Sequence, residues 1–309
     1  MSLDLHRAGL PSGEVAYADE GEGPPVVLLH GYPTSSHLWR DLVPILAPRF
    51  RAVAPDLLGY GASSKPEDPD HLTIRAQAAM VRELLAHLRI EDDAAVIGHD
   101  IGGGVAQLLA LEGGVKVLVL VDSISFDSWP IEGVRMLQDA DPEQVDRDFA
   151  RGVAGIALEL GMSHPERLAD EDREVFLRPW LDDPMALIRA ARAIDGAGLV
   201  DTEARLAGLD TRTLVLWGED DPYQPEELAE RLGEVMPGAT VALLPGCSHF
   251  VTEDAPEATL PLIAEYLRVH HLEETHAHDT GPVAVDLGIS FERPERPSPP
   301  EGFEDLGEA

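Results

Sequence analysis

An aspartate occupies the turn of a strand–turn–helix pattern, where a side chain can attack a bound substrate. Asp100 follows an apolar run at 94–97 and lies in the pattern Gly98-x-Asp100-x-Gly102. Serine at such a turn suits acyl carbon, because the acyl-serine ester can be hydrolysed afterwards. A carboxylate is already an anion at pH 7 and can attack saturated carbon, which gives an alkyl ester of the enzyme. We therefore predict that Asp100 is a nucleophile for saturated carbon.

Further segments supply what the hydrolysis of such an ester requires. His249 follows the last apolar run and can activate water, if a carboxylate holds its ring. Asp221, in the run GEDD, is our choice for that carboxylate, and Asp122, at the end of VKVLVLVD, is the alternative. The catalytic set is thus predicted to be Asp100, His249 and Asp221.

Two backbone amides are predicted to form an oxyanion hole. Tyr32 lies in the run HGYP directly after an apolar strand, and Ile101 follows the nucleophile. Their N–H groups can face the carboxyl group of Asp100 and hold the negative oxygen that forms when water attacks the ester.

Short apolar runs rich in valine and leucine alternate with helical patterns along most of the chain. Such runs are typical of strands that are covered on both faces, so they predict a parallel sheet of α/β class. Each chemical motif follows one of these strands, where open parallel sheets place their sites. The runs lie at 25–30, 51–56, 94–100, 115–122, 211–218 and 239–246, and a helix is predicted at 74–89.

The interval between the fourth and fifth of these strands is too long for one helix. It contains helical patterns at 142–157, 171–180 and 184–194, so we predict a helical cap at 127–205 inserted between two parts of the core, 1–126 and 206–270. The acidic, proline-rich end at 271–309 lacks periodicity and is predicted to be disordered.

The net charge of −34 comes from 57 acidic and 23 basic residues, with only two lysines. This charge excludes nucleic acid as a partner and predicts adaptation to a salt-rich cytoplasm, because salt screens the self-repulsion. No apolar run is long enough to cross a membrane, so we expect a soluble, cytoplasmic protein. The single cysteine, Cys247, excludes a disulfide within the chain and a cysteine-based zinc site, and we expect no metal or other cofactor.

The order nucleophile, acid, histidine over residues 10–270 resembles the α/β-hydrolase superfamily. The Asp turn and the run HGYPTSSHLWR at 30–40 look like the branch of haloalkane dehalogenases and epoxide hydrolases. This resemblance implies a mostly parallel sheet flanked by helices, and attack by Asp100 on a small-molecule substrate. The ester would then be hydrolysed by water that His249 activates.

The leaving group is less clearly indicated. Haloalkane dehalogenases usually bind halide with a tryptophan after the nucleophile and often with an asparagine after His-Gly, where this chain has Ile101 and Tyr32. Trp180 is our candidate halide donor, and Trp129 and Trp39 are further candidates for the leaving-group or substrate pocket. Epoxide hydrolases use tyrosines of the cap as acids, but no tyrosine lies between residues 61 and 222, which leaves Tyr32.

Two classes of function follow. A haloalkane dehalogenase-like hydrolase is the first expectation, with an epoxide hydrolase as the alternative enzyme. A small-molecule-binding protein of the same fold without catalysis is the alternative from another class. Formation of an ester on Asp100 distinguishes the enzymes from the binding protein.

Overall fold

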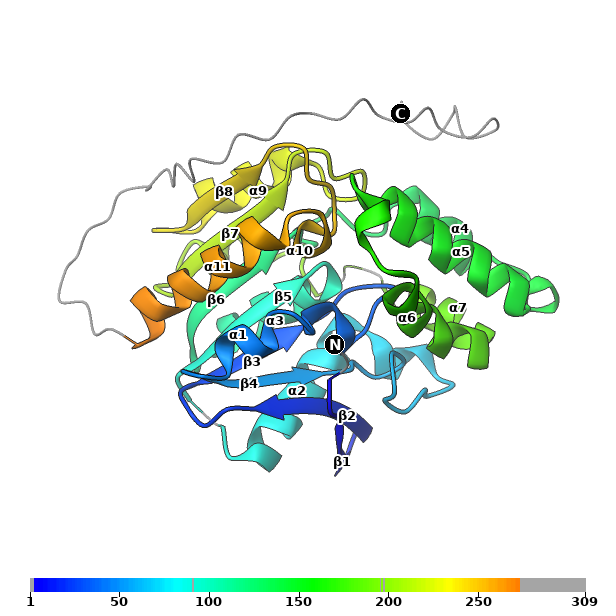
Figure 1. Ribbon diagram of the computed structural model, residues 1–309, viewed down its shortest axis with the longest axis horizontal. Helices are drawn as coiled ribbons and strands as arrows, with labels where there is room; N and C mark the ends of the chain where they lie inside the picture. The colour runs from blue at the N-terminus through cyan, green and yellow to red at the C-terminus, as the bar shows by residue number, and fades with distance from the viewer. Residues whose placement is uncertain (1–2, 91, 195, 197, 273–309) are drawn as a thin grey trace.

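A computed structural model describes residues 3–90, 92–194, 196 and 198–272. Its centre is an eight-stranded sheet in the order β1-β2-β4-β3-β5-β6-β7-β8 (Figure 1). The strands from β3 onward are parallel to one another, while β2 is antiparallel to both of its neighbours. The strands are β1 (His6–Leu10), β2 (Gly13–Glu20), β3 (Pro25–Leu29), β4 (Arg51–Pro55), β5 (Ala94–His99), β6 (Val115–Val121), β7 (Arg212–Gly218) and β8 (Thr240–Leu244).

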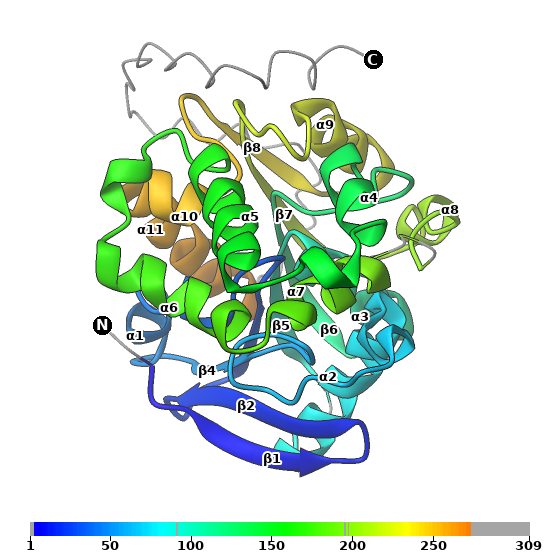
Figure 2. The same cartoon turned by 90° about the vertical axis from the view of Figure 1, so that its right-hand side faces the viewer.

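The parallel strands are buried because helices cover both faces of the sheet, as Figure 2 shows. One face carries α2 (Ile74–Leu88), α3 (Ile101–Glu112) and α9 (Glu226–Val235). The other face carries α1 (Val43–Leu46) and α11 (Pro256–Leu267), preceded by α10 (Val251–Asp254). The hydroxyl of Thr73 caps the first turn of α2, which ends at Arg89 in the left-handed conformation. The predicted α/β sheet with flanking helices is confirmed.

Among the described residues, five α-helices lie between β6 and β7, and Figure 1 shows the four longer ones together at one side of the sheet. These inserted helices are α4 (Glu132–Gln138), α5 (Arg147–Leu160), α6 (Asp170–Asp182), α7 (Pro184–Ala193) and α8 (Glu203–Leu206). The helix predicted at 142–157 begins later than expected. A 3-10 turn at Pro142–Gln144 comes first, and the carboxylate of Asp146 then caps α5 at the N–H of Phe149.

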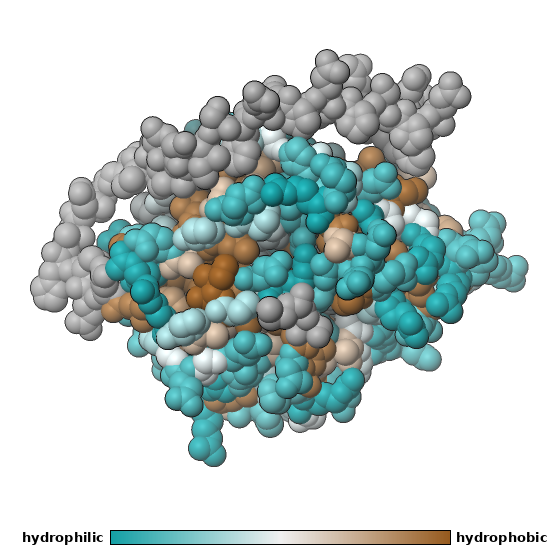
Figure 3. Space-filling model, viewed as in Figure 1, coloured by the Kyte–Doolittle hydropathy of each residue, from teal (hydrophilic) through white to brown (hydrophobic). Residues whose placement is uncertain are grey.

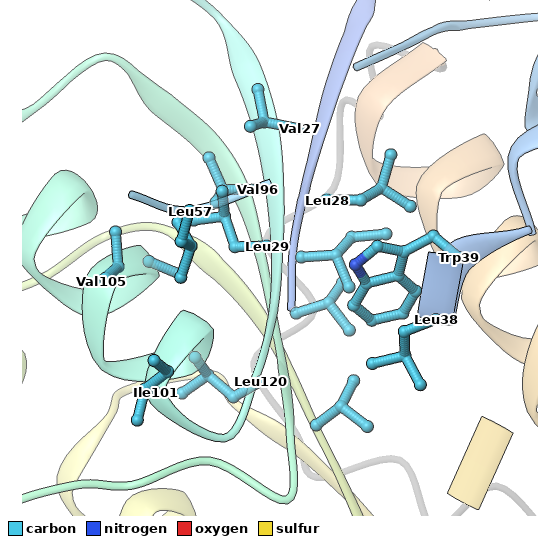
Figure 4. Close-up of a cluster of buried hydrophobic side chains, with 14 of the residues drawn as sticks. Val27, Leu28, Leu29, Leu38, Trp39, Leu57, Val96, Ile101, Val105 and Leu120 are labelled. Atoms are coloured by element: carbon cyan, nitrogen blue, oxygen red, sulfur yellow. The ribbon is translucent and has the colours of Figure 1, made fainter. Parts of the chain in front are cut away.

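The apolar core lies between the sheet and its helices. Figure 4 shows Leu28 of β3 on the side where Trp39 packs, and Leu29 on the opposite side with Val105 of α3. The remaining short elements are 3-10 turns at Ser36–Trp39, Pro69–Leu72 and Pro165–Arg167 and a π-helical turn at Arg268–Leu272.

The structure adds two features that the sequence patterns did not predict. The first twenty residues include the hairpin β1–β2. Its second strand, β2, pairs with β4 and extends the sheet by two antiparallel strands.

His271, which was predicted to begin a disordered tail, is instead buried. Its ring stacks on Phe50 and its Nε2 lies 3.1 Å from the carbonyl oxygen of Pro25. The rest of the predicted tail, 273–309, lies outside the described residues.

The face of the molecule in Figure 3 is largely hydrophilic, as the excess of acidic residues requires. No helix among the described residues is long and apolar enough to cross a membrane. The same residues contain no group of three or more His, Cys, Asp or Glu side chains that could hold a metal ion.

Candidate active site

Asp100 lies at a sharp turn between β5 and α3. Its φ of 50° and ψ of −119° are rare for a residue with a side chain, and such strain is stored mainly at functional sites. The turn is possible because its neighbours lack side chains. A Cβ at Gly98 would lie 2.3 Å from the carbonyl oxygen of Gly102, and a Cβ at Gly102 would lie 2.4 Å from that of Leu29. The Gly-x-Asp-x-Gly pattern thus reflects close backbone packing.

The two carboxylate oxygens of Asp100 have different surroundings. Oδ2 accepts a hydrogen bond of 2.9 Å from the N–H of Tyr32, and the N–H of Ile101 also donates to this carboxylate. Oδ1 is buried and has no hydrogen-bond partner among the described residues. The two amides predicted to form an oxyanion hole therefore contact the carboxyl group itself. One oxygen is held, and the other is available to form a bond.

His249 and Asp221 lie together beside Asp100. The Nδ1 atom of His249 is 2.9 Å from Oδ2 of Asp221. The other oxygen of Asp221 accepts hydrogen bonds from the N–H groups of Tyr223 and Gln224, at 2.7 and 3.0 Å. These donors stabilise the negative charge of Asp221 and fix its direction toward the imidazole. Among the ionisable groups around Asp100, His249 exerts the largest effect on its pKa.

The acid–base properties of these groups follow from burial and neighbouring charge. Burial raises the pKa of Asp100 to about 6, although the charge of His249 and the two backbone hydrogen bonds oppose the rise. Burial lowers the pKa of His249, but the charge and hydrogen bond of Asp221 outweigh it and raise the pKa above its usual value. A base with a pKa near neutrality is suited to remove a proton from water.

The alternative acid, Asp122, ends β6 close to the other carboxylates but has a different role in the structure. Its Oδ1 accepts a hydrogen bond of 2.8 Å from the N–H of Gly218, and its Oδ2 is buried with no partner among the described residues. Burial and the nearby charge of Asp221 raise the pKa of Asp122 well above its usual value. The structure thus favours the protonated form of Asp122 and does not direct it at the histidine, whereas Asp221 contacts the histidine.

Exchange of each carboxylate for an amide should separate these two roles. We expect Asp221→Asn to lower the rate of ester hydrolysis by about 100-fold or more, because the amide cannot stabilise a charged imidazole. We expect Asp122→Asn to change it less than about tenfold, because an amide oxygen still accepts from Gly218 and Asp122 makes no hydrogen bond to the histidine in the described structure. The decay of the alkyl ester in a single turnover measures the rate of hydrolysis in each variant. A larger loss of rate in Asp122→Asn than in Asp221→Asn would mean that Asp122, and not Asp221, is the carboxylate that supports His249.

The pKa of Asp100 predicts how the first chemical step depends on pH. Only the ionised carboxylate attacks, so formation of the ester should be fastest above pH 7 and fall as the pH drops through about 6. At pH 5 we expect about a tenth of the maximal rate. Rapid-quench mass spectrometry of the wild-type protein measures this step directly. A rate that stays constant between pH 7 and pH 5 would contradict the prediction.

The three tryptophans proposed for the pocket lie in different places. The indole N–H of Trp180, on α6, donates to the carbonyl oxygen of Pro33 at 2.7 Å. Trp39 is fully buried in the apolar core (Figure 4). Trp129 begins the inserted segment, and its Nε1, like that of Trp39, is buried with no hydrogen-bond partner among the described residues.

Sequence reasoning missed Tyr60, which lies among the aromatic residues beside Asp100. Its ring contacts those of Tyr32 and Trp180, with centroids 6.3 and 5.5 Å away. Burial and the charge of Asp100 both raise the pKa values of Tyr32 and Tyr60, so both hydroxyls are protonated at pH 7. A signal was present in the sequence, because Tyr60 follows the carboxyl end of β4, at the same edge of the sheet as the other motifs.

Comparisons with known proteins agree with this fold. Residues 24–256 match the model of the alpha/beta hydrolase fold family. The chain is 30% identical to haloalkane dehalogenase 2 of Mycobacterium tuberculosis (strain CDC 1551 / Oshkosh), over 82% of this chain and 91% of that protein. It is also 30% identical to the soluble epoxide hydrolase of Corynebacterium sp. (strain C12), over 83% and 95%. An alpha/beta hydrolase fold protein from Burkholderia ambifaria has a similar structure, with a TM-score of 0.78 and 29% identity over 86% of this chain and 99% of that one.

Proposed function

Because this chain belongs to the α/β-hydrolase fold family, we propose that it is a hydrolase that opens carbon–heteroatom bonds at saturated carbon. The observation that carries the proposal is the asymmetric carboxylate of Asp100, with one oxygen held by the N–H of Tyr32 and the other without a hydrogen-bond partner among the described residues. Oδ1 attacks the carbon in line as the leaving group departs, and an alkyl ester forms. The relatives named above as a dehalogenase and an epoxide hydrolase support a small-molecule substrate of this type.

The second step regenerates the enzyme. His249 takes a proton from water, and the resulting hydroxide attacks the carbonyl carbon of the Asp100 ester. The N–H groups of Tyr32 and Ile101 stabilise the negative charge on Oδ2. When the tetrahedral intermediate collapses, the bond between that carbon and the alkyl oxygen breaks. The alcohol leaves with a proton from His249, and Asp100, which is left as the carboxylic acid with one oxygen from water, loses its proton to solvent and so regains its carboxylate.

The leaving group that the geometry supports best is the oxygen of an epoxide. Ring opening generates an alkoxide, which needs a proton. The hydroxyls of Tyr32 and Tyr60 can supply it, because they keep their protons and lie close enough to Asp100 for its charge to raise their pKa values. The hydroxyl of Tyr32 is only weakly held, 3.5 Å from the carbonyl oxygen of Leu187. Dehalogenation is the second candidate. The 30% identity with haloalkane dehalogenase 2 favours it.

The test is to trap the ester by removing the base. We expect His249→Ala to accumulate an alkyl adduct on Asp100 when it is incubated with epoxides or brominated alkanes, because water is no longer activated. Intact mass and peptide mapping identify the adduct, and the compound that forms it fastest identifies the leaving group. A folded variant that binds these compounds saturably but never forms an adduct would favour the non-catalytic binding function.

Solvent oxygen provides a control for the route of hydrolysis. In a single turnover of the wild-type protein in ¹⁸O-labelled water, we expect the label in the carboxylate of Asp100 and not in the alcohol product. Label found only in the product would show that water attacks the substrate directly. Asp100 would then not be the nucleophile.

A further inference from the structure

The proposed nucleophile is closed off from solvent. Asp100 is 1% exposed and His249 is 2% exposed. A substrate therefore reaches them only through a passage that opens during turnover. The place where the passage begins should be a hollow on the surface that is separated from Asp100 by a thin, movable layer.

A cavity of about 550 Å³ has these properties. It lies between the start of the chain, the loop after β4 and helix α6. Its volume falls within the usual range for sites that bind small molecules. Much of its wall is apolar, which suits the hydrocarbon part of a haloalkane or an epoxide. The apolar wall residues are Leu3, Leu5, Ala62, Val175 and Pro179.

A single layer of residues separates this cavity from the aromatic residues beside Asp100. Ser35, Gly61 and Pro179 line the cavity. Gly61 and Pro179 are the chain neighbours of Tyr60 and Trp180, whose rings contact each other at 5.5 Å. The ring of Trp180 also lies 6.2 Å from that of Tyr32, whose N–H holds the carboxylate of Asp100.

Trp180 links this layer to the core. Its indole N–H donates to the carbonyl oxygen of Pro33 and so joins α6 to the loop after β3, by a buried hydrogen bond of 2.7 Å. Near the start of α6, Asp172 also contacts His37 and Arg40 of the core. Movement of the indole would break the bond to Pro33 and separate its ring from those of Tyr32 and Tyr60 without disturbing the contacts of Asp172.

We propose that the cavity between residues 3–5, 56–65 and α6 is the entrance vestibule for the substrate, and that Trp180 is the gate between it and Asp100. The inference rests on the proposed function, because it assigns the route by which a substrate of that reaction arrives. Trp180 is then a specificity-determining residue, since the width of the opening that it leaves limits the size of the substrate.

The test blocks the vestibule with a label and measures the alkylation of Asp100. Cys247 is 1% exposed, so an introduced surface cysteine can be labelled selectively. Ala62→Cys in the His249→Ala background places a bulky maleimide in the vestibule. Ala264→Cys in the same background is the matched control, because Ala264 lines a separate cavity of about 310 Å³ between the loop after α1 and α11. Both labelled proteins are first compared with the unlabelled one by circular dichroism.

We expect the label at position 62 to slow the alkylation of Asp100 at least about tenfold, and the label at position 264 to leave the rate unchanged. Equal rates for the two labelled proteins would overturn the vestibule while the adduct itself still supported the proposed function. If unlabelled His249→Ala forms no adduct with any probe, both proposals are overturned.

A second variant tests the gate itself. Trp180→Phe keeps an aromatic ring but removes the N–H that binds the carbonyl oxygen of Pro33. In the His249→Ala background, we expect the rate at which a bulky aryl epoxide alkylates Asp100, divided by the rate for a small epoxide, to rise at least about threefold relative to the protein with Trp180. An unchanged ratio would overturn the role of Trp180 as the gate.

Discussion

Exchange of Asp100 for asparagine should abolish turnover and leave the fold intact. The side chains have nearly the same shape, and the amide oxygen of asparagine can still accept from the N–H of Tyr32. The neutral amide cannot attack saturated carbon, so no ester forms. We expect kcat to fall by about 10⁴-fold or more, which is typical for loss of a nucleophile. Product formation from the substrate identified by the trapping experiment measures the effect.

This experiment needs two controls. Deamidation would restore aspartate at position 100, so the mass of the variant must be verified after the assay. Asp210→Asn makes the same chemical change at an exposed position just before β7, at the opposite end of that strand from the site, and should keep full activity. Full activity in an Asp100→Asn sample free of deamidation would mean that another group attacks the substrate.

The second large effect is expected from salt. We expect the protein to lose its structure as salt is lowered from molar to millimolar concentration, because 34 uncompensated negative charges repel one another. The screening length grows from about 3 Å at 1 M to about 30 Å at 0.01 M, so at low salt each charge acts on many others. Circular dichroism during stepwise dilution of sodium chloride measures the loss.

A variant with fewer charges distinguishes repulsion from other effects of salt. Glu227, Glu230 and Glu234 are exposed on α9, at spacings that bring neighbouring side chains close together. We expect the triple change to glutamine to lower the salt concentration at which half of the protein is folded. A circular dichroism spectrum that is the same in molar and millimolar salt would rule out adaptation to high salt through surface charge.

The sequence alone was sufficient to predict the sheet and the order of the motifs along it. Buried parallel strands are near-continuous runs of valine and leucine, and the carboxyl ends of parallel strands meet at one edge. Local rules of this kind placed Asp100 directly after β5 and His249 beyond β8. The hairpin β1–β2 was missed because it alternates weakly and pairs with β4, a contact between distant parts of the chain.

Only the tertiary structure decided which side chains meet. Asp122 and Asp221 both follow strands at the same edge, so the spacing Gly218-x-x-Asp221 favoured Asp221 without excluding Asp122. The two carboxylates are distinguished by their surroundings. Backbone N–H groups of Tyr223 and Gln224 hold Asp221, whereas burial raises the pKa of Asp122. Similarly, nothing in the sequence indicated that the N–H of Trp180 is bound to Pro33, and the position of Tyr60 after β4 did not by itself show that its ring contacts that of Tyr32. Strands and turns follow from local residue preferences, whereas these contacts depend on how the inserted helices pack against loops that are far away in the sequence.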